Sequence, residues 1–164
     1  MKFVRLLALP FLLGVISAAA AQVKLGNDVL AQNHFAALKG KRIGLITNPS
    51  GVTRDLVSTI ELLRHAPGVK LVALFGPEHG VYGDVHAGDT IASKVDQRTG
   101  LPVHSLYGET RKPSTEMLSG LDALVYDLQD TGCRAYTFIS TMGLAIDKLT
   151  DEQAKYADDY SAGT

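Results

Sequence analysis

The sequence predicts an α/β protein with a doubly wound, mostly parallel sheet in a Rossmann-like, three-layer architecture. Three observations predict this fold. Four short runs rich in Val, Ile and Leu have the composition of strands, helical segments lie before and between them, and the runs are almost continuously apolar. Near-continuous apolarity is typical of parallel strands covered on both faces, and the repetition of strand and helix builds a doubly wound sheet.

The predicted strands are short, and turn-forming residues follow each of them. They are Arg42–Thr47, Val69–Phe75, Pro102–Leu106 and Ala123–Leu128. Two longer segments have apolar residues at helical spacing, which predicts helices with one buried face. These are Asp28–Leu38, with Leu30, Phe35 and Leu38 on one face, and Asp55–His65, with Leu56, Ile60 and Leu63.

Two further helices are indicated by their start signals. Pro113 with Ser114 predicts the start of a third, short helix, because Pro is favoured in a first turn and Ser is a good N-cap. Ser140 or Thr141 is expected to cap a fourth helix for the same reason. The sequence shows no internal repeat and no low-complexity tract.

The N-terminal residues have the composition of a secretory signal peptide. Lys2 and Arg5 give the chain a basic start, and an apolar stretch follows from Leu6 to Ile16. Alanines at 19–21 form a small-residue cleavage site. The apolar stretch is too short to cross a hydrocarbon core of roughly 30 Å. We therefore expect residues 1–21 to be removed and the mature chain to be periplasmic or secreted, with no stable membrane insertion.

Charge and cysteine content narrow the function classes. The formal charge is −1, and removal of the signal peptide would make it −3, with no basic stripe. Nucleic acid is therefore not an expected partner, since phosphate binding needs clustered Lys and Arg. The single cysteine, Cys133, cannot form an intramolecular disulfide, so we expect an ordinary hydrophobic core.

The C-terminal segment differs from the rest of the chain. Residues 150–164 contain few apolar side chains, and no further strand follows them. We expect residues 22–149 to form a partial Rossmann-like domain of catalytic type and residues 150–164 to be a poorly ordered polar tail. A frayed terminal helix and an interrupted reading frame, which would leave the sheet incomplete at its C-terminal end, are the two interpretations.

Polar residues gather where the predicted strands end. The clusters are TNPSG at 47–51, GPEHGVYGD at 76–84, YGETRKP at 107–113 and DLQDTGCRAY at 127–136. In an open α/β sheet, ligands bind outside the carboxyl ends of the strands. Turn formation explains the Gly, Pro, Asn and Asp content, but it explains Glu78, His79, Gln129, Arg134 and Tyr136 poorly.

Glu78 is the first candidate for chemistry, because a Gly- and Pro-rich loop holds it directly after a buried strand. A partly desolvated carboxyl can keep its proton and act as a general acid, although most loop glutamates are simply solvated. Asp127 and Asp130 are the nearest candidates for a second carboxylate, and glycoside hydrolysis requires two. We expect the Glu78 loop and the segment 127–134 to face each other across one pocket.

Other chemistries remain as alternatives. His79, Asp84, His86 and Asp89 could supply metal ligands for a hydrolase, but their spacing matches no standard metal signature. Cys133 beside Arg134 could be an activated thiol, yet a lone cysteine is more often a small buried hydrophobe. The sequence contains neither the GxSxG motif of a nucleophile elbow nor the motif of a phosphate-binding loop.

Five segments in unbroken order resemble the exo-β-N-acetylmuramidase (NamZ) family of peptidoglycan recycling. They are GLITNPSGVTRD, LFGPEHGVYGD, AGD, TGLPVHSLYGETRKPSTEML and LVYDLQDTGCRAYTFISTM. The resemblance implies a glycosidase that releases N-acetylmuramic acid from the non-reducing end of peptidoglycan fragments, and it implies no nucleotide, metal or other cofactor. The family's members are much longer, and the likeness fades after Ile146.

The resemblance also implies site residues. The Glu of GPEHG is the implied catalytic carboxyl, which is Glu78 here, with Asp127 as the candidate partner. The implied substrate-binding residues are Asn48, His79, Gln129, Asp130, Arg134 and Tyr136. We expect Arg134 to bind a lactyl carboxylate, and the amides and Tyr136 to contact hydroxyl and acetamido groups. An inactive or purely sugar-binding fragment of such an enzyme is the alternative.

Overall fold

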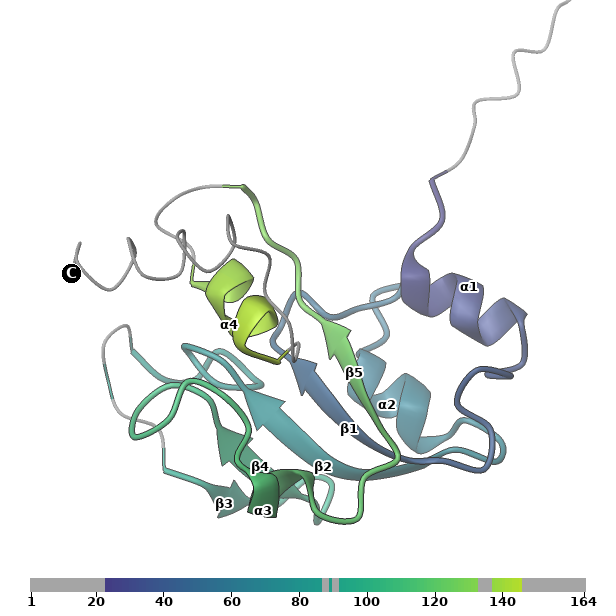
Figure 1. Ribbon diagram of the computed structural model, residues 1–164. Coiled ribbons are helices and arrows are strands. Elements are labelled where there is room, and N and C mark those ends of the chain that lie inside the picture. Colours follow the sequence, from purple (N-terminus) through teal and green to yellow (C-terminus); the bar gives the residue numbers. More distant parts are fainter. Residues whose placement is uncertain (1–22, 87–88, 90–91, 133–136, 146–164) are drawn as a thin grey trace, which may run out of the picture.

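The computed structural model describes residues 23–86, 89, 92–132 and 137–145. Its elements, labelled in Figure 1, are α1 Gly26–Gln32, β1 Arg42–Thr47, α2 Thr59–Arg64, β2 Lys70–Gly76, β3 Lys94–Val95, β4 Pro102–Ser105, α3 Thr115–Leu118, β5 Ala123–Asp127 and α4 Phe138–Ala145. The expected signal peptide and the polar tail lie outside the described residues. None of the helices in the described part of the chain is long and apolar enough to cross a membrane.

The strands form one sheet in the order β3-β4-β2-β1-β5. β1 pairs in parallel with both β2 and β5, β2 pairs in parallel with β4, and the edge strand β3 pairs antiparallel with β4. The chain moves outward from β1 to β2 and β4 and then returns to β5 on the other side of β1. The winding therefore reverses beside β1, as in a doubly wound sheet.

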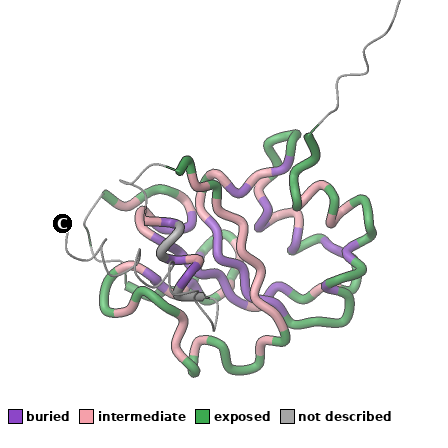
Figure 2. Tube along the Cα trace, turned by 45° about the horizontal axis from the view of Figure 1, so that its top comes forward, coloured by how far each residue is buried: buried purple, intermediate pink, exposed green. Residues whose placement is uncertain are grey.

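Two hydrophobic clusters cover the two faces of the sheet. On one face, Ile43 and Leu45 of β1 pack with Ile60 and Leu63 of α2. On the other face, Ile46 and Phe75 pack with Leu106, and Met117 of α3 and Leu124 of β5 lie against them. Figure 2 shows the buried segments running along the central strands, with exposed segments around them. The predicted mostly parallel α/β fold is confirmed.

The strand predictions differ from the structure only at the ends and at one edge. The strand predicted over Arg42–Thr47 has those bounds, and the other three shift or shorten by one residue. β3 was not predicted, because Lys94 and Val95 are both exposed and form no apolar run. A two-residue strand with no buried face has no periodicity from which it could be recognised.

The first predicted helix is wrong in its second half. α1 ends at Gln32, and the chain then turns through His34 and Phe35, whose φ angles are 52° and 54°. Such left-handed conformations cannot continue an α-helix. Phe35 and Leu38 are nevertheless buried, each 8% exposed. The apolar spacing therefore indicated the right core residues in the wrong local structure.

The second predicted helix starts later than expected. Residues before it form a tight turn in which the Thr53 N–H donates to the Val57 carbonyl, and α2 begins at Thr59. Ser58 caps the helix by accepting from the Ile60 N–H. Leu56 is 79% exposed with a φ of 61°, so its expected place on the buried face is wrong.

The last two helices give one confirmed cap and one correction. Ser114 caps α3 by accepting from the Met117 N–H, as predicted. α4 begins at Phe138, so the prediction that Ser140 or Thr141 caps it is wrong. The Tyr126 hydroxyl donates to the Phe138 carbonyl at 2.8 Å, which ties the start of α4 to β5.

Candidate active site

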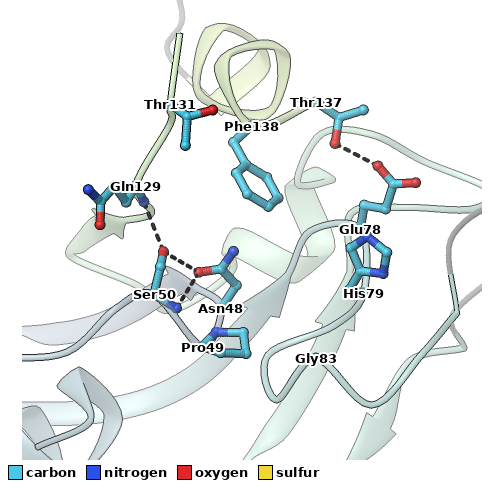
Figure 3. Close-up of a pocket in the computed structure, with 10 residues that line it drawn as sticks. All are labelled: Asn48, Pro49, Ser50, Glu78, His79, Gly83, Gln129, Thr131, Thr137 and Phe138. Carbon is cyan, nitrogen blue, oxygen red and sulfur yellow. Dashed lines mark hydrogen bonds between the residues drawn. The ribbon is translucent and has the colours of Figure 1, made fainter. Parts of the chain in front are cut away.

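A pocket of about 550 Å³ opens where the winding of the sheet reverses. It lies at the carboxyl ends of β1, β2 and β5 and is closed on one side by the start of α4 (Figure 3). Its lining residues are Asn48, Pro49, Ser50, Glu78, His79, Gly83, Gln129, Thr131, Thr137 and Phe138. Both the volume and the position are typical of small-ligand sites in α/β proteins, which measure roughly 300–1,000 Å³.

The loops after β2 and β5 meet in this pocket. Glu78 and His79 line one side, and Gln129 and Thr131 line the other, which confirms the expectation that these two loops share a single pocket. The third polar cluster, residues 107–113 after β4, contributes no lining residue. β4 is separated from β1 by β2, so its carboxyl end lies away from the point of reversal.

The Glu78 loop is a tight turn that needs its glycines. A Cβ on Gly76 would lie 3.2 Å from both the Gly80 Cα and the Val81 nitrogen, and Gly80 itself has a φ of 76°. His79 also adopts a left-handed conformation, with a φ of 69°, which is uncommon for a residue with a side chain. Backbone strain of this kind persists where the surrounding structure holds it, and it often marks functional loops.

Glu78 is half-buried, and one of its oxygens has a fixed partner. The Thr137 hydroxyl donates to Glu78 Oε2 at 2.9 Å, as Figure 3 shows. Thr137 directly precedes α4, so this bond joins the loop after β2 to the helix that closes the pocket. Glu78 Oε1 has no hydrogen-bond partner among the described residues. The carboxyl group is therefore oriented through one oxygen, and the other is left for a ligand.

The hydrogen bond of His79 fixes which ring nitrogen carries a proton. His79 Nδ1 lies 2.9 Å from the Val85 carbonyl oxygen. A carbonyl oxygen can only accept, so Nδ1 is the protonated nitrogen. In the neutral ring, Nε2 is then an acceptor, which suits a hydroxyl donor on a ligand.

The loops after β1 and β5 are joined by a chain of hydrogen bonds. The Gln129 N–H donates to Ser50 Oγ at 3.1 Å, and the Ser50 hydroxyl donates to Asn48 Oδ1 at 2.6 Å. The Ser50 N–H also donates to Asn48 Oδ1, at 2.9 Å. Linked hydrogen bonds of this type strengthen one another and hold the side chains in one arrangement.

Close backbone packing brings the three loops together. A Cβ on Gly51 would lie 2.1 Å from Thr47 Oγ1 and 2.9 Å from the Asp127 carbonyl oxygen, and one on Gly83 would lie 2.9 Å from Pro49 Cγ. The Thr47 hydroxyl donates to the same Asp127 carbonyl at 3.0 Å. Residues without a side chain are therefore required at the points where the loops touch.

Asp127 and Asp130 are not among the lining residues. Asp127 Oδ2 accepts from the Thr59 hydroxyl at 2.5 Å and from Asn27 Nδ2 at 3.3 Å, contacts that tie β5 to α2 and α1. Asp130 Oδ1 accepts from the Gly132 N–H at 2.7 Å in a turn. The catalytic role of Asp127 and the binding role of Asp130 stay predictions, and the contacts of Asp127 are those of a structural carboxylate.

Some predicted site residues lie outside the described part of the chain, and some lining residues of the pocket were not predicted. Arg134 and Tyr136 lie outside the described residues, as does Cys133, so their roles stay predictions. Ser50, Thr131, Thr137 and Phe138 line the pocket but were not singled out. Their segments carried the family resemblance, but no pattern marks which side chain of a loop points into a pocket.

The potential metal ligands after β2 do not form a cluster. Among the described residues, no three His, Cys, Asp or Glu side chains are grouped so that they could hold a metal ion. His79, Asp84, His86 and Asp89 all belong to the described part, and they are not gathered into such a group. The proposal of a metal-dependent hydrolase therefore gains no support from these four side chains.

A family model described as "Exo-beta-N-acetylmuramidase NamZ, N-terminal" matches residues 43–157. The chain belongs to this family. The matched range includes all the lining residues of the pocket. A peptidoglycan β-N-acetylmuramidase NamZ from Bacillus subtilis (strain 168) is 52% identical over 131 residues, which are 80% of this chain and 32% of the relative.

Two solved structures of DUF1343 family proteins from Bacteroides fragilis NCTC 9343 have a similar fold to this NamZ-family chain. One is 61% identical with a TM-score of 0.67, covering 74% of this chain and 30% of its own. The other is 32% identical with a TM-score of 0.58, covering 83% and 33%. The chain thus spans about a third of the length of the relatives that it matches.

Proposed function

We propose that the chain carries the substrate pocket of a glycoside hydrolase of peptidoglycan turnover, which releases N-acetylmuramic acid from the non-reducing end of glycan or muropeptide fragments. The observation that carries the proposal is the position of Glu78. Its carboxyl group lines a pocket at the point of winding reversal, in a chain of the NamZ family. The Bacillus relative is named a peptidoglycan β-N-acetylmuramidase, which agrees with this assignment.

Glu78 is proposed to act as the general acid. Its Oε2 is oriented by Thr137, its Oε1 has no hydrogen-bond partner among the described residues, and the residue lines the pocket, so it can protonate the glycosidic oxygen as the bond to the leaving sugar breaks. His79 Nε2 is proposed to accept from a sugar hydroxyl, because Nδ1 is engaged with Val85. Asn48 supplies an amide group on the opposite side of the pocket, which Gln129 also lines.

Sugar binding without hydrolysis is the second candidate, and one observation favours it. Among the described lining residues, Glu78 is the only carboxylate, while glycosidases of the usual type use two. Asp127 does not fill this role in the described geometry, because its Oδ2 is bound by Thr59 and Asn27. A chain of this kind would bind the sugar and leave the glycosidic bond intact.

The experiment is a hydrolysis assay with the 164-residue chain and a chromogenic N-acetylmuramyl glucosaminide. We expect release of N-acetylmuramic acid by the wild type and a loss of about 10²–10⁴-fold in Glu78→Gln, the usual contribution of a general acid. Glu116→Gln is the matched control, since Glu116 is exposed on α3 and does not line the pocket. Undiminished release in Glu78→Gln would refute the catalytic assignment, and sugar binding without any release would favour the second candidate.

We also propose that the chain is exported and that the signal peptide of residues 1–21 is removed. The support is the basic start, the short apolar stretch and the alanines at 19–21. Mass spectrometry of the protein recovered from an expressing bacterium should give a mature chain that begins near Gln22. A cytoplasmic protein that retains Met1 or Lys2 would contradict export.

A further inference from the structure

We propose that Asn48, Pro49 and Phe138 form a subsite for the N-acetyl group of the sugar, and that Ser50 is the residue that positions it. This inference rests on the proposed function, because it names which part of the muramyl sugar one side of the pocket recognises. Ser50 and Phe138 take part in no step of the chemistry proposed above. Their roles follow from the direction of hydrogen bonds and from the apolar surface next to them.

The orientation of the Asn48 amide is fixed by donors on Ser50. Asn48 Oδ1 receives the Ser50 N–H at 2.9 Å and the Ser50 hydroxyl at 2.6 Å. A flipped amide would place its NH₂ group against a backbone N–H, and two donors cannot bond to each other. The oxygen of Asn48 is therefore occupied, and its NH₂ group is the part that remains for a ligand.

The direction in which the Ser50 hydroxyl donates is also fixed. It accepts from the Gln129 N–H at 3.1 Å, so its proton is directed to Asn48 Oδ1. The Gln129 N–H can only donate, so it sets the direction of both hydrogen bonds in the chain from Gln129 through Ser50 to Asn48. Nδ2 of Asn48 has no hydrogen-bond partner among the described residues, and Asn48 lines the pocket. This position therefore offers donors only, and it selects an oxygen acceptor.

The surroundings of the donor decide which acceptor fits. Figure 3 shows the Phe138 ring pointing across the pocket toward Asn48 and Pro49. Phe138 is only 7% exposed, which places it in a largely desolvated wall. A carboxylate would lose hydration against this apolar wall and share the pocket with the Glu78 carboxyl. An acetamido group is neutral, and its carbonyl can accept from Asn48 while its methyl contacts Phe138 and Pro49.

The substitution Asn48→Asp tests the donor with little change of shape. An aspartate keeps an oxygen for both Ser50 donors and replaces only the NH₂ group, which turns the donor toward the ligand into an acceptor. Ser50→Ala removes the hydroxyl that orients the amide, and Ser50→Thr restores it. Asn33→Asp is the matched control, because it makes the same chemical change at an exposed residue after α1.

The measurement is the binding of N-acetylmuramic acid and of muramic acid, which lacks the acetyl group, by titration calorimetry of the folded 164-residue chain. We expect the wild type and Asn33→Asp to prefer the acetylated sugar by about tenfold or more, the usual value of one well-placed hydrogen bond and a buried methyl group. The preference should vanish in Asn48→Asp, weaken in Ser50→Ala and return in Ser50→Thr. Dichroism spectra check that each variant is folded.

The outcomes separate this inference from the proposed function. Binding of N-acetylmuramic acid with no preference for the acetyl group, or a preference that survives in Asn48→Asp, would overturn the subsite and leave the sugar pocket intact. An equal loss in Ser50→Ala and Ser50→Thr would overturn the positioning role of Ser50. If the folded wild type bound neither sugar, the proposed function would fail, and the subsite would fail with it.

Discussion

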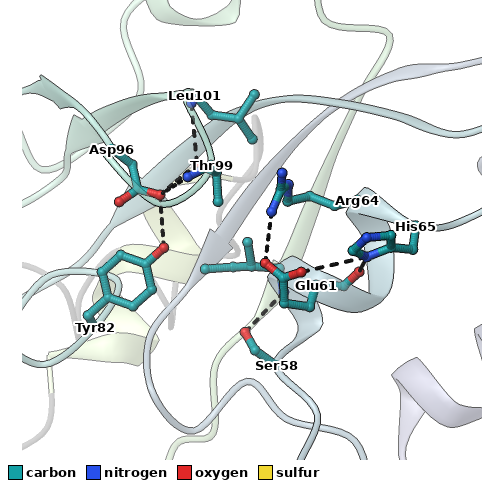
Figure 4. A network of polar contacts seen from close by, with 9 residues as sticks. Ser58, Glu61, Arg64, His65, Tyr82, Asp96, Thr99 and Leu101 are labelled. Carbon is teal, nitrogen blue, oxygen red and sulfur yellow. Dashed lines mark hydrogen bonds and ion pairs between the residues drawn. The ribbon is translucent and has the colours of Figure 1, made fainter.

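Two carboxylates, Asp96 and Glu78, each lie just after a strand of the sheet, but they differ in burial and in the number of their hydrogen bonds. Asp96, next to β3, is 6% exposed, and its Oδ2 accepts from the Tyr82 hydroxyl at 2.9 Å, the Thr99 N–H at 2.9 Å and the Thr99 hydroxyl at 2.6 Å (Figure 4). Glu78, after β2, has one hydrogen-bond donor among the described residues, Thr137, and borders a pocket of about 550 Å³. A carboxylate with three hydrogen bonds to one oxygen stabilises the fold, while one with a single donor beside a cavity is available for chemistry.

The charge on Asp96 is held by the same contacts. Burial opposes ionisation, but the hydrogen bonds from Thr99 and Tyr82 outweigh it and hold the pKa of Asp96 below its ordinary value. Burial and the bond to Asp96 raise the pKa of Tyr82 to about 12, so this phenol remains a donor at neutral pH. Tyr82 lies four residues after Glu78, so its hydrogen bond to Asp96 anchors the loop that carries the pocket carboxyl.

The largest expected effect on stability is that of Asp96→Ala. It leaves the Tyr82 hydroxyl and the Thr99 N–H without their acceptor, which should lower the free energy of unfolding by about 2–4 kcal/mol. Urea unfolding at pH 7 measures the change. Glu78→Ala is the comparison variant and should cost less than about 1 kcal/mol, since only one half-buried hydrogen bond is lost. Equal losses in the two variants would contradict the contrast between the carboxylates.

The contribution of Asp96 should also depend on pH. Its pKa in the folded chain is depressed below 3.8, so the unfolded chain binds the proton more tightly. The stabilisation is therefore complete above the unfolded value and is lost as the pH falls through the lower, folded value. The difference in unfolding free energy between wild type and Asp96→Asn should be constant from pH 7 to about 5 and shrink below about pH 3.8. A difference in unfolding free energy that grows as the pH falls would contradict a depressed pKa of Asp96 in the folded chain.

Asp127 should behave like Asp96 and unlike Glu78. Thr59→Val removes the hydroxyl that donates to Asp127 Oδ2, and we expect a loss of about 1–2 kcal/mol in urea unfolding. Asp127→Asn should be similarly destabilised and should still bind N-acetylmuramic acid within about twofold of the wild type, because its side chain does not line the pocket. A stable Asp127→Asn variant that no longer binds or hydrolyses the sugar would restore the catalytic prediction for this residue.

The smallest expected change is a gain in stability at Leu56. This residue is 79% exposed with a φ of 61°, a conformation that is strained for a leucine and free for a glycine. Leu56→Gly should raise the free energy of unfolding by about 0.5–1 kcal/mol, since the relief of strain exceeds the added flexibility of the unfolded chain. Thermal unfolding measures it, and sugar binding should not change. A lower melting temperature would show that the Leu56 side chain has a stabilising contact.

Much of the fold could be predicted because buried parallel strands leave a strong sequence signal. The four apolar runs correspond to β1, β2, β4 and β5, and their order along the chain with helices between them was sufficient for the fold class. The end of α1 could not be predicted, because the left-handed turn at His34 and Phe35 keeps the same apolar residues buried that a longer helix would bury. The spacing of apolar residues indicates which residues are buried, but it does not indicate the backbone conformation in which they are buried.

The site was predictable at the level of loops and less so at the level of side chains. The rule that ligands bind at strand ends brought Glu78, His79 and Gln129 to one pocket, together with Asn48. Asp127 occupies the last position of β5, and the direction in which its carboxyl turns depends on Thr59 and Asn27, which are distant in sequence. Contacts of this range leave no local pattern.

The most direct test of the central claim is a map of backbone amide shifts in the ¹⁵N-labelled chain as N-acetylmuramic acid is added. Binding in the pocket predicts the largest changes at Asn48, Ser50, Glu78, His79 and Gln129, with the amides of Asp96, Thr99 and Leu101 nearly unmoved. Changes centred on the Asp96 network, or no changes at any concentration of the sugar, would contradict the assignment of the pocket as the muramyl-sugar site.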